Sequence, residues 1–393
     1  MDFRRLQELS LKGKTALVRV DFNVPRHDGG EISDLTRIKA ALPTIKALQK
    51  GGAKTVLLSH FGRPKGEVKS EFSLRFIVPV LSELLGCDVA FSDRIDTADI
   101  DALSAGDVLL LENTRFDPRE TKGEAELSRA YATLGDVFIQ DAFSSAHRAH
   151  CSSAGIAEFL PAYAGLAMER ELDHLAQALE NPQAPVMAVV GGAKVSTKID
   201  LLDNLVTKLD QLVIGGGMAN TFLAAQGHDV GLSLCEHDLK ATALKIMESA
   251  DAAGCEIILP RDVVVAKEFA AHAPHRVCAL DDVGSDEMIL DAGPNSVNAL
   301  ADVIDAAKTL IWNGPLGAFE LAPFDTSTVE VANYTARRVK DAGLVAVAGG
   351  GDTVAALSHA GAADGFTFIS TAGGAFLEWM EGKALPGVEI LKT

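Results

Sequence analysis

Two polar side chains, Asp21 and Asn23, stand where an apolar run gives way to a proline at position 25. The run, residues 15–20, predicts a buried strand, and open α/β sheets bind ligands beyond the carboxyl ends of their strands. Side chains two residues apart on an extended chain face the same side. A carboxylate and an amide placed there can hydrogen-bond one polyhydroxy ligand, although the same pair would also suit an ordinary polar turn.

Basic side chains follow the other strands expected in the first half, at residues 55–58, 108–111 and 137–140. If these strands lie side by side, their loops share one edge of a sheet and point Arg63, Arg115 and Arg148 into one crevice. Arg37 would join them from a helix expected at residues 35–48. Most of the arginines lie in residues 1–180, which suits recognition of a carboxylate or a phosphate.

The second half follows its strands with glycine instead. The strands are expected at residues 186–190, 212–214, 310–312, 344–348 and 366–369. Glycine lets backbone N–H groups approach a phosphate closely, and a following helix N-terminus adds a favourable dipole. One such loop is usually only a tight turn, but five in one domain predict a nucleotide site.

Three charged side chains in these loops could act on a nucleotide. Asp352 could bind Mg²⁺, which takes one or two carboxylates plus phosphates, or could merely cap a helix. Lys194 and Lys198 are four residues apart, so they would share a face if their loop opens a helix. Like charges at that spacing repel unless an anion lies between them; the alternative is a solvated pair on a surface helix.

The common nucleotide motifs are missing. Residues 13–15 imitate the end of a P-loop, but Glu8 stands where its first glycine should be, and a strand follows. The glycine pairs at 215–217 and 349–351 lack the third glycine of a dinucleotide fingerprint.

Length and composition indicate two α/β domains: 393 residues, 48% hydrophobic and 23% charged. The net charge of −18 argues against nucleic acid or an anionic membrane surface as a partner. No run of apolar residues is long enough for a membrane span, and the first residues lack a signal-peptide core, so we expect a cytoplasmic protein. Five cysteines without a C-x-x-C pair argue against a disulfide framework, and no metal-ligand cluster suggests zinc.

Alternating strand and helix patterns predict two Rossmann-like domains, each a parallel sheet flanked by helices. A helical pattern at residues 168–179 ends before Pro182 and Pro185 and marks the boundary. We therefore expect an N-terminal domain at 1–167, an interdomain helix and hinge at 168–184, and a C-terminal domain at 185–377. Residues 378–393 are expected to pack back on the N-terminal domain.

With these motifs in order, the chain resembles the phosphoglycerate kinase family over essentially its full length. In the first half the matching stretches are residues 18–25, 60–64, 111–116 and 141–150. In the second half they are residues 191–195, 215–219, 312–315 and 349–353.

The resemblance implies reversible phosphoryl transfer from 1,3-bisphosphoglycerate to ADP by a monomer that closes its two domains, with Mg²⁺ as cofactor. It places 3-phosphoglycerate on the N-terminal domain, with Asp21 and Asn23 at the glycerate end. The residues that it places around the 3-phosphate are His60, Arg63, Arg115 and Arg148. Those that it assigns to catalysis are Arg37, Lys198, Gly350 and Gly373, and it assigns Arg37 to substrate binding as well. Those that it assigns to ADP or ATP are Lys194, Lys198, Gly215, Gly216, Asn313, Glu320 (on the ribose), Gly349, Gly350, Gly351, Asp352 (on magnesium) and Thr353.

The chain departs from the family pattern at four places: Ala372 for a glycine, Ser144-Ser145 for Gly-Thr, Thr197 for an aspartate, and Thr114 for an aliphatic residue. None removes a charged group on which the assignment depends, so they bear on kinetics rather than on activity. Two other classes share paired α/β domains. A dinucleotide-dependent dehydrogenase would bind NAD rather than ADP, and a two-lobed anion-binding protein would show no catalysis.

Overall fold

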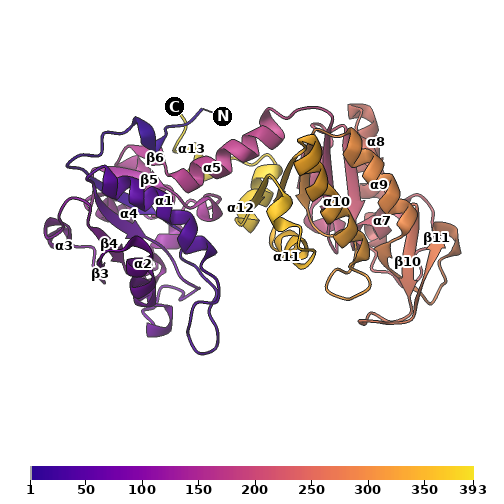
Figure 1. The fold of residues 1–393 in the computed structure, drawn as a ribbon, viewed down its shortest axis with the longest axis horizontal. Coiled ribbons are helices and arrows are strands. Elements are labelled where there is room, and N and C mark those ends of the chain that lie inside the picture. Colours follow the sequence, from indigo (N-terminus) through magenta and orange to yellow (C-terminus); the bar gives the residue numbers. More distant parts are fainter. Residues whose placement is uncertain (1) are drawn as a thin grey trace. The chain divides into compact units, whose positions relative to one another are not determined.

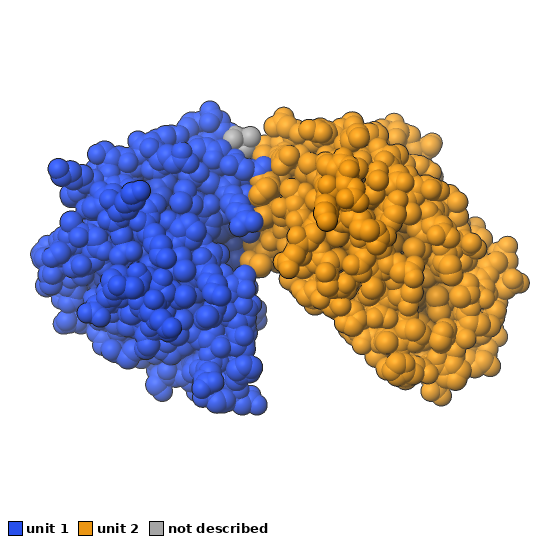
Figure 2. Space-filling model, viewed as in Figure 1, with its two compact units in different colours: residues 1–173, 384–393 blue, residues 174–383 orange. Residues whose placement is uncertain are grey.

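The computed structural model describes residues 2–393. The chain divides into two compact units: unit 1 comprises residues 1–173 and 384–393, and unit 2 comprises residues 174–383 (Figure 2). Each unit has its own six-stranded sheet, in which all neighbouring strands are parallel (Figure 1). The predicted fold class is confirmed.

The sheet of unit 1 has the strand order β3-β4-β2-β1-β5-β6. Its strands are β1 (Thr15–Arg19), β2 (Lys54–Leu58), β3 (Val89–Ser92), β4 (Val108–Leu111), β5 (Val137–Gln140) and β6 (Ala162–Ala164). The helices that begin in this unit are α1 (Thr36–Lys50), α2 (Ile77–Leu85), α3 (Thr97–Asp101), α4 (Ala125–Ala132), α5 (Leu166–Leu175) and α13 (Pro386–Glu389). The four predicted strands are central neighbours within one residue of their expected bounds, whereas the two edge strands β3 and β6 were not predicted.

The central strands form because their side chains are buried on both faces of the sheet, which requires uninterrupted apolar runs. On one face Val18 and Leu110 pack against α1, whose residues Ile38, Ile45 and Leu48 are all buried in the same core. Their spacings of seven and three residues place them along one side of the helix. The sheet and α1 therefore fix the first loops at the carboxyl edge.

The sheet of unit 2 has the strand order β15-β14-β13-β7-β8-β9. Its strands are β7 (Val186–Gly191), β8 (Gln211–Gly215), β9 (Glu256–Ile258), β13 (Thr309–Asn313), β14 (Val345–Gly349) and β15 (Phe368–Ser370). The helices are α6 (Ile199–Leu205), α7 (Gly217–Ala225), α8 (Lys240–Ala253), α9 (Pro294–Ala306), α10 (Thr326–Ala342), α11 (Gly351–His359) and α12 (Gly373–Met380). The five predicted strands are all present, again adjacent, and their glycine loops therefore share the carboxyl edge.

A second sheet in unit 2 was not predicted. It is antiparallel, with the order β11-β10-β12, and is formed by β10 (Asp262–Ala266), β11 (His275–Ala279) and β12 (Met288–Ala292). Most of β11 is exposed, so it lacks the apolar run by which the buried strands were found.

The predicted boundary helix is α5, which continues as a π-helical turn, Ala176–Glu180, and ends before Asn181. The last residues of the chain belong to unit 1. Arg4 N–H donates to Leu391 O at 2.9 Å, and Gly387 N–H donates to Ala146 O at 2.8 Å. None of the helices among the described residues combines the length and apolar character needed to span a membrane.

Candidate active site

Backbone and side-chain hydrogen bonds join the loops that follow β1, β2 and β4 in unit 1. The Asn23 Oδ1 atom accepts from Gly62 N–H at 2.9 Å, and Arg115 Nη1 donates to Gly62 O at 2.8 Å. Asn113 Nδ2 donates to Phe61 O at 2.7 Å. Three loops that are far apart in sequence are thus held as one surface at the carboxyl edge of the sheet.

An ion pair with Asp21 holds Arg37, at the start of α1, against this surface. Its Nη1 atom lies 2.8 Å from Asp21 Oδ2 and 3.1 Å from Asn23 O. Ser144, in the loop after β5, donates to the same carboxylate oxygen at 2.5 Å. Asp21 therefore links the β1 loop, α1 and the β5 loop, while the remaining guanidinium donors of Arg37 stay available.

The edge carries more positive charge than its carboxylates balance. Arg63 and Arg148 are exposed. Burial first, and then the charges of Arg19 and Arg63, lower the pKa of Arg115, while the charge of Glu120 acts in the opposite direction. Burial, with Arg115 as the largest charged contributor, lowers the pKa of His150 to about 4. We call His60, Arg37, Arg63, Arg115 and Arg148 the basic edge; its surplus charge suits an anionic ligand.

Beneath the basic edge lies a buried arginine that sequence reasoning missed. Arg19 is 1% exposed, and its Nη2 atom lies 2.9 Å from His60 Nδ1. Burial lowers the pKa of Arg19, and the charge of Glu120, which is also buried, acts in the opposite direction. An arginine inside an apolar strand was the available signal, because such a residue must be paired if it is buried.

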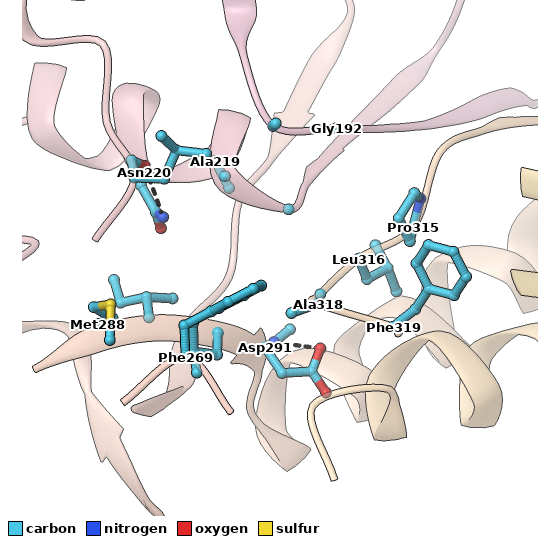
Figure 3. A pocket seen from close by; sticks show the side chains of 18 of the residues that line it. Gly192, Ala219, Asn220, Phe269, Met288, Asp291, Pro315, Leu316, Ala318 and Phe319 are labelled. Carbon is cyan, nitrogen blue, oxygen red and sulfur yellow. Dashed lines mark hydrogen bonds between the residues drawn. The ribbon is translucent and has the colours of Figure 1, made fainter. Parts of the chain in front are cut away.

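In unit 2 the glycine loops border a cavity of about 530 Å³. Its walls are largely apolar, and Met288 and Phe269 lie across it from Ala219 and Asn220 (Figure 3). Phe269 is 63% exposed, and two further apolar side chains that line the cavity are exposed as well: Leu232 and Leu234. Exposed apolar groups gathered in a hollow are typical of a ligand site, here one that suits a flat base.

Of the residues predicted to bind a nucleotide, Gly216, Glu320 and Asp352 line this cavity. Glu320 and Asp352 are both exposed. The apolar wall was missed, because its residues come from segments scattered between positions 219 and 319 that share no motif.

Two glycines shape the loops at this edge. Gly216 precedes α7 with φ +66°, and Gly350 precedes α11 with φ +100°. A Cβ atom at Gly350 would lie 2.8 Å from Asn313 Nδ2. Both positions thus favour glycine, and each leads into a helix N-terminus at the edge. In α7 the Met218 N–H already donates to Gly192 O at 2.9 Å.

Lys198 is held by three oxygen atoms. Its Nζ atom lies 2.6 Å from Gly191 O, 2.6 Å from Asn313 Oδ1 and 3.0 Å from Asn313 O. Burial lowers its pKa to about 8, although Asp352 acts in the opposite direction. This ammonium group is preorganised among loop carbonyls rather than solvated on a surface helix.

Lys194 and Lys198 do not share a helix face. Residues Val195–Thr197 form a 3₁₀ turn and α6 starts only at Ile199, so the i, i+4 relation does not apply. Lys194 is exposed. Thr353 is buried and its Oγ1 accepts from Gly314 N–H at 2.7 Å, so its observed contact ties the β14 loop to the β13 loop.

The departures from the family pattern fit their surroundings. Ala372 has φ −93°, an ordinary value for alanine, so the missing glycine imposes no strain there. Ser144 contributes the hydrogen bond to Asp21, and Thr197 Oγ1 donates to Lys194 O at 2.9 Å. Thr114 is buried, and nothing in the structure explains its hydroxyl. Among the described residues, no group of three or more His, Cys, Asp or Glu side chains could hold a metal ion by itself.

Comparisons with known proteins all point to one family. The family model described as "Phosphoglycerate kinase" matches residues 6–383. Phosphoglycerate kinases from Caulobacter vibrioides and Brucella abortus are 59% and 58% identical over 397 aligned residues, covering 100% of this chain and of each relative. The structure of phosphoglycerate kinase from Coxiella burnetii is 42% identical with a TM-score of 0.93, covering 99% of this chain and 98% of that one.

These matches exclude the dehydrogenase and binding-protein alternatives. The chain therefore belongs to the phosphoglycerate kinase family and is an enzyme that transfers a phosphoryl group between 1,3-bisphosphoglycerate and ADP.

Proposed function

We propose that unit 1 binds 3-phosphoglycerate on the basic edge and that unit 2 binds ADP or ATP at its glycine edge. The observation that carries this assignment is the contrast between the two carboxyl edges. One gathers guanidinium groups around a single paired carboxylate, Asp21, whereas the other joins an apolar cavity to helix N-termini and Lys198.

On unit 1, Asp21 and Asn23 would receive the glycerate end of the substrate. The Asn23 Nδ2 group remains available as a donor, since the hydrogen bond from Gly62 N–H uses the Oδ1 atom of this side chain. His60, Arg63, Arg115 and Arg148 would surround the 3-phosphate. Charge-assisted hydrogen bonds from arginine to phosphate are among the strongest polar contacts available.

On unit 2, the apolar cavity would take the base and Glu320 the ribose. The phosphates would lie against Gly215, Gly216 and the loop of residues 349–351, where α7 and α11 present their N-termini. Lys198 would reach the transferred group, with Lys194 near the other phosphates. Gly373, the first residue of α12, would supply a further backbone donor.

Asp352 fits the magnesium that this chemistry requires. It is a single exposed carboxylate at the cavity, and magnesium commonly takes one or two carboxylates while nucleotide phosphates and water fill the other positions. When bound, the ion neutralises charge on the phosphates.

Asp352→Asn keeps the side-chain shape and removes the charge. We expect weaker MgADP binding by calorimetry and a marked loss of activity at low Mg²⁺ that higher Mg²⁺ restores in part. An unchanged dependence on magnesium would remove Asp352 from this role.

The residue inventory suits phosphoryl transfer without a general base. The acceptor in the reverse direction is a carboxylate, which is already ionised at neutral pH. The protein must then position the reactants and neutralise charge on a loose transition state. Arg37, Lys198 and the amides near Gly350 and Gly373 would supply that stabilisation, since preorganised donors are usually the largest single contribution.

A coupled assay for 1,3-bisphosphoglycerate formation, with calorimetry on each substrate, tests the placement. Arg63→Met and Arg148→Met should raise the KM for 3-phosphoglycerate and leave MgATP affinity unchanged, because a contact equal in ground and transition states is uniform binding. Arg129→Met, on α4, is a matched control. Unchanged KM values in both site variants would contradict the placement on unit 1.

We also propose that the enzyme acts as a cytoplasmic monomer. Each proposed site is built from residues of one chain, so catalysis needs no second copy. Light scattering of the purified protein at assay concentration should give the mass of one chain, and a stable dimer would contradict this part of the proposal.

A further inference from the structure

The contact between Arg19 and His60 fixes where the imidazole carries its proton. Arg19 Nη2 lies 2.9 Å from His60 Nδ1, and Arg19 Nη1 donates to Val20 O at 2.6 Å. A guanidinium group is always charged in proteins and has only donors. His60 Nδ1 must therefore be the acceptor and carry no proton, which leaves the single ring proton on Nε2.

Protonation of the second nitrogen would destroy this hydrogen bond and add a charge to a crowded site. Burial first, and then the positive charges of Arg19 and Arg115, hold the pKa of His60 well below its usual value. The other groups that face the ring, Arg37 and His150, act in the same direction. His60 is thus neutral at physiological pH.

We infer that Arg19 is a positioning residue that sets His60 as a neutral Nε2–H donor toward the substrate. The Nε2 atom makes no hydrogen bond to any residue from 2 to 393, so it is available to a ligand. The inference rests on the proposed placement of 3-phosphoglycerate. On this inference, His60 donates a hydrogen bond to a substrate oxygen as a neutral group, unlike the cationic arginines around it.

The surroundings explain why the position is an arginine. Its two terminal nitrogens serve two acceptors at once, which the single ammonium of a lysine could not span in the same way. Glu120 is 0% exposed and accepts from Ser152 N–H at 3.1 Å and from Ser152 Oγ at 2.5 Å. With Asp21, it supplies the negative charge that balances Arg19 in the interior.

Long-range ¹H–¹⁵N correlation NMR on the unliganded full-length protein tests the tautomer directly. We expect His60, assigned through the loss of its signals in His60→Gln, to show an unprotonated Nδ1 and a protonated Nε2 at pH 7. A ring protonated on Nδ1, or on both nitrogens, would overturn the inference. This readout needs no substrate.

Kinetics test the functional part. Arg19→Met should raise the KM for 3-phosphoglycerate about tenfold, the cost of one hydrogen bond in a charged site, and leave the KM for MgATP within about twofold. Arg94→Met, an exposed arginine of the same unit, should change neither. Adding Arg19→Met to His60→Ala should raise KM little beyond His60→Ala alone, because Arg19 acts through the ring. Fully additive effects would show a role independent of His60 and overturn the inference.

If Arg19→Met does not fold because Glu120 loses its counter-charge, the double variant Arg19→Met with Glu120→Gln removes both buried charges and takes its place in the cycle. A normal KM in His60→Ala would contradict the substrate placement itself. A wrong tautomer in the NMR spectrum would contradict only the role of Arg19.

Discussion

Arg37 and Lys198 are assigned to one transferred phosphoryl group, yet the structure prepares them differently. Arg37 is partly exposed and makes an ion pair with Asp21 through Nη1, so its other guanidinium donors stay free. Lys198 is surrounded by neutral oxygens, and its charge depends on pH. The two cations should therefore fail in different ways when they are changed.

Arg37→Ala should lower kcat by at least about a hundredfold, typical of removing one preorganised charge donor, while the KM for MgATP stays near its normal value. Steady-state kinetics measure this. Arg129→Ala, which removes an arginine from α4 of the same unit, is the control and should leave kcat unchanged. A near-normal kcat in Arg37→Ala would remove Arg37 from the transition state.

The lowered pKa of Lys198 predicts that catalytic activity falls at alkaline pH. With a pKa of about 8 in the free enzyme, the Lys198 side chain is mostly protonated at pH 7 and loses its proton, and so its charge, as the pH rises through 8. The kcat/KM for MgATP, which reports groups of the free enzyme, should therefore fall above pH 8. Lys198→Arg carries a permanent charge. It should be less active because its shape differs, but its profile should be flat across that range. If kcat/KM for MgATP still falls above pH 8 in Lys198→Arg, the fall is caused by the titration of another group.

At the scale of secondary-structure elements, the turn from β14 into α11 depends on Gly350. Gly350→Ala adds a Cβ atom that would meet Asn313 Nδ2 at 2.8 Å, and its φ of +100° disfavours any L side chain. We expect MgATP affinity to fall at least about tenfold, because the loop that presents the α11 N-terminus must shift. Calorimetry measures the affinity.

Gly361, after the C-terminal end of the same helix, supplies the matched control. It has φ +66°, and a Cβ atom there would meet nothing within 4 Å, so Gly361→Ala adds backbone strain without a steric clash. It should lower the melting temperature and leave MgATP affinity unchanged. Equal losses of affinity in both variants would mean that general destabilisation, not loop geometry, is responsible.

The same elements show what the sequence could and could not predict. Strands buried on both faces are apolar runs, so the central strands of both sheets and the polar or glycine loops after them were found to within about two residues. The exposed strand β11 carries no such run. Contacts across long sequence distances were also out of reach: Lys198 is held by Asn313 and Arg19 pairs with His60. No local pattern specifies either pair.

At the scale of the whole molecule, the division of the chain into two units raises the question of how two substrates meet. We propose that the units close around both substrates, since direct transfer requires contact and closure excludes water. The chain passes between the units at residues 173–174 and 383–384. The proposed hinges are residues 181–185, which lie within unit 2 close to the first crossing, and the segment after Glu378, which leads to the second.

Small-angle scattering tests closure. The radius of gyration should fall when 3-phosphoglycerate and MgADP are both present, and should fall less with either alone. Arg37→Ala removes one side chain of the basic edge and keeps the others, so it should still become more compact at saturating concentrations of both substrates, which separates closure from chemistry. An unchanged radius with both substrates bound would contradict closure as a step in the reaction.

The discontinuity of unit 1 has a consequence for how the protein is made. Leu385, Val388 and Leu391 are buried in unit 1, and Gly387 binds Ala146 O, in the loop that carries Arg148. A ribosome synthesises residues 384–393 only after all of unit 2. Unit 2 can therefore form all its contacts first, whereas unit 1 lacks its last segment, residues 384–393, until synthesis ends. The loop that carries Arg148 therefore gains its contact with Gly387 only at the end of translation, after all the residues of unit 2 have been made.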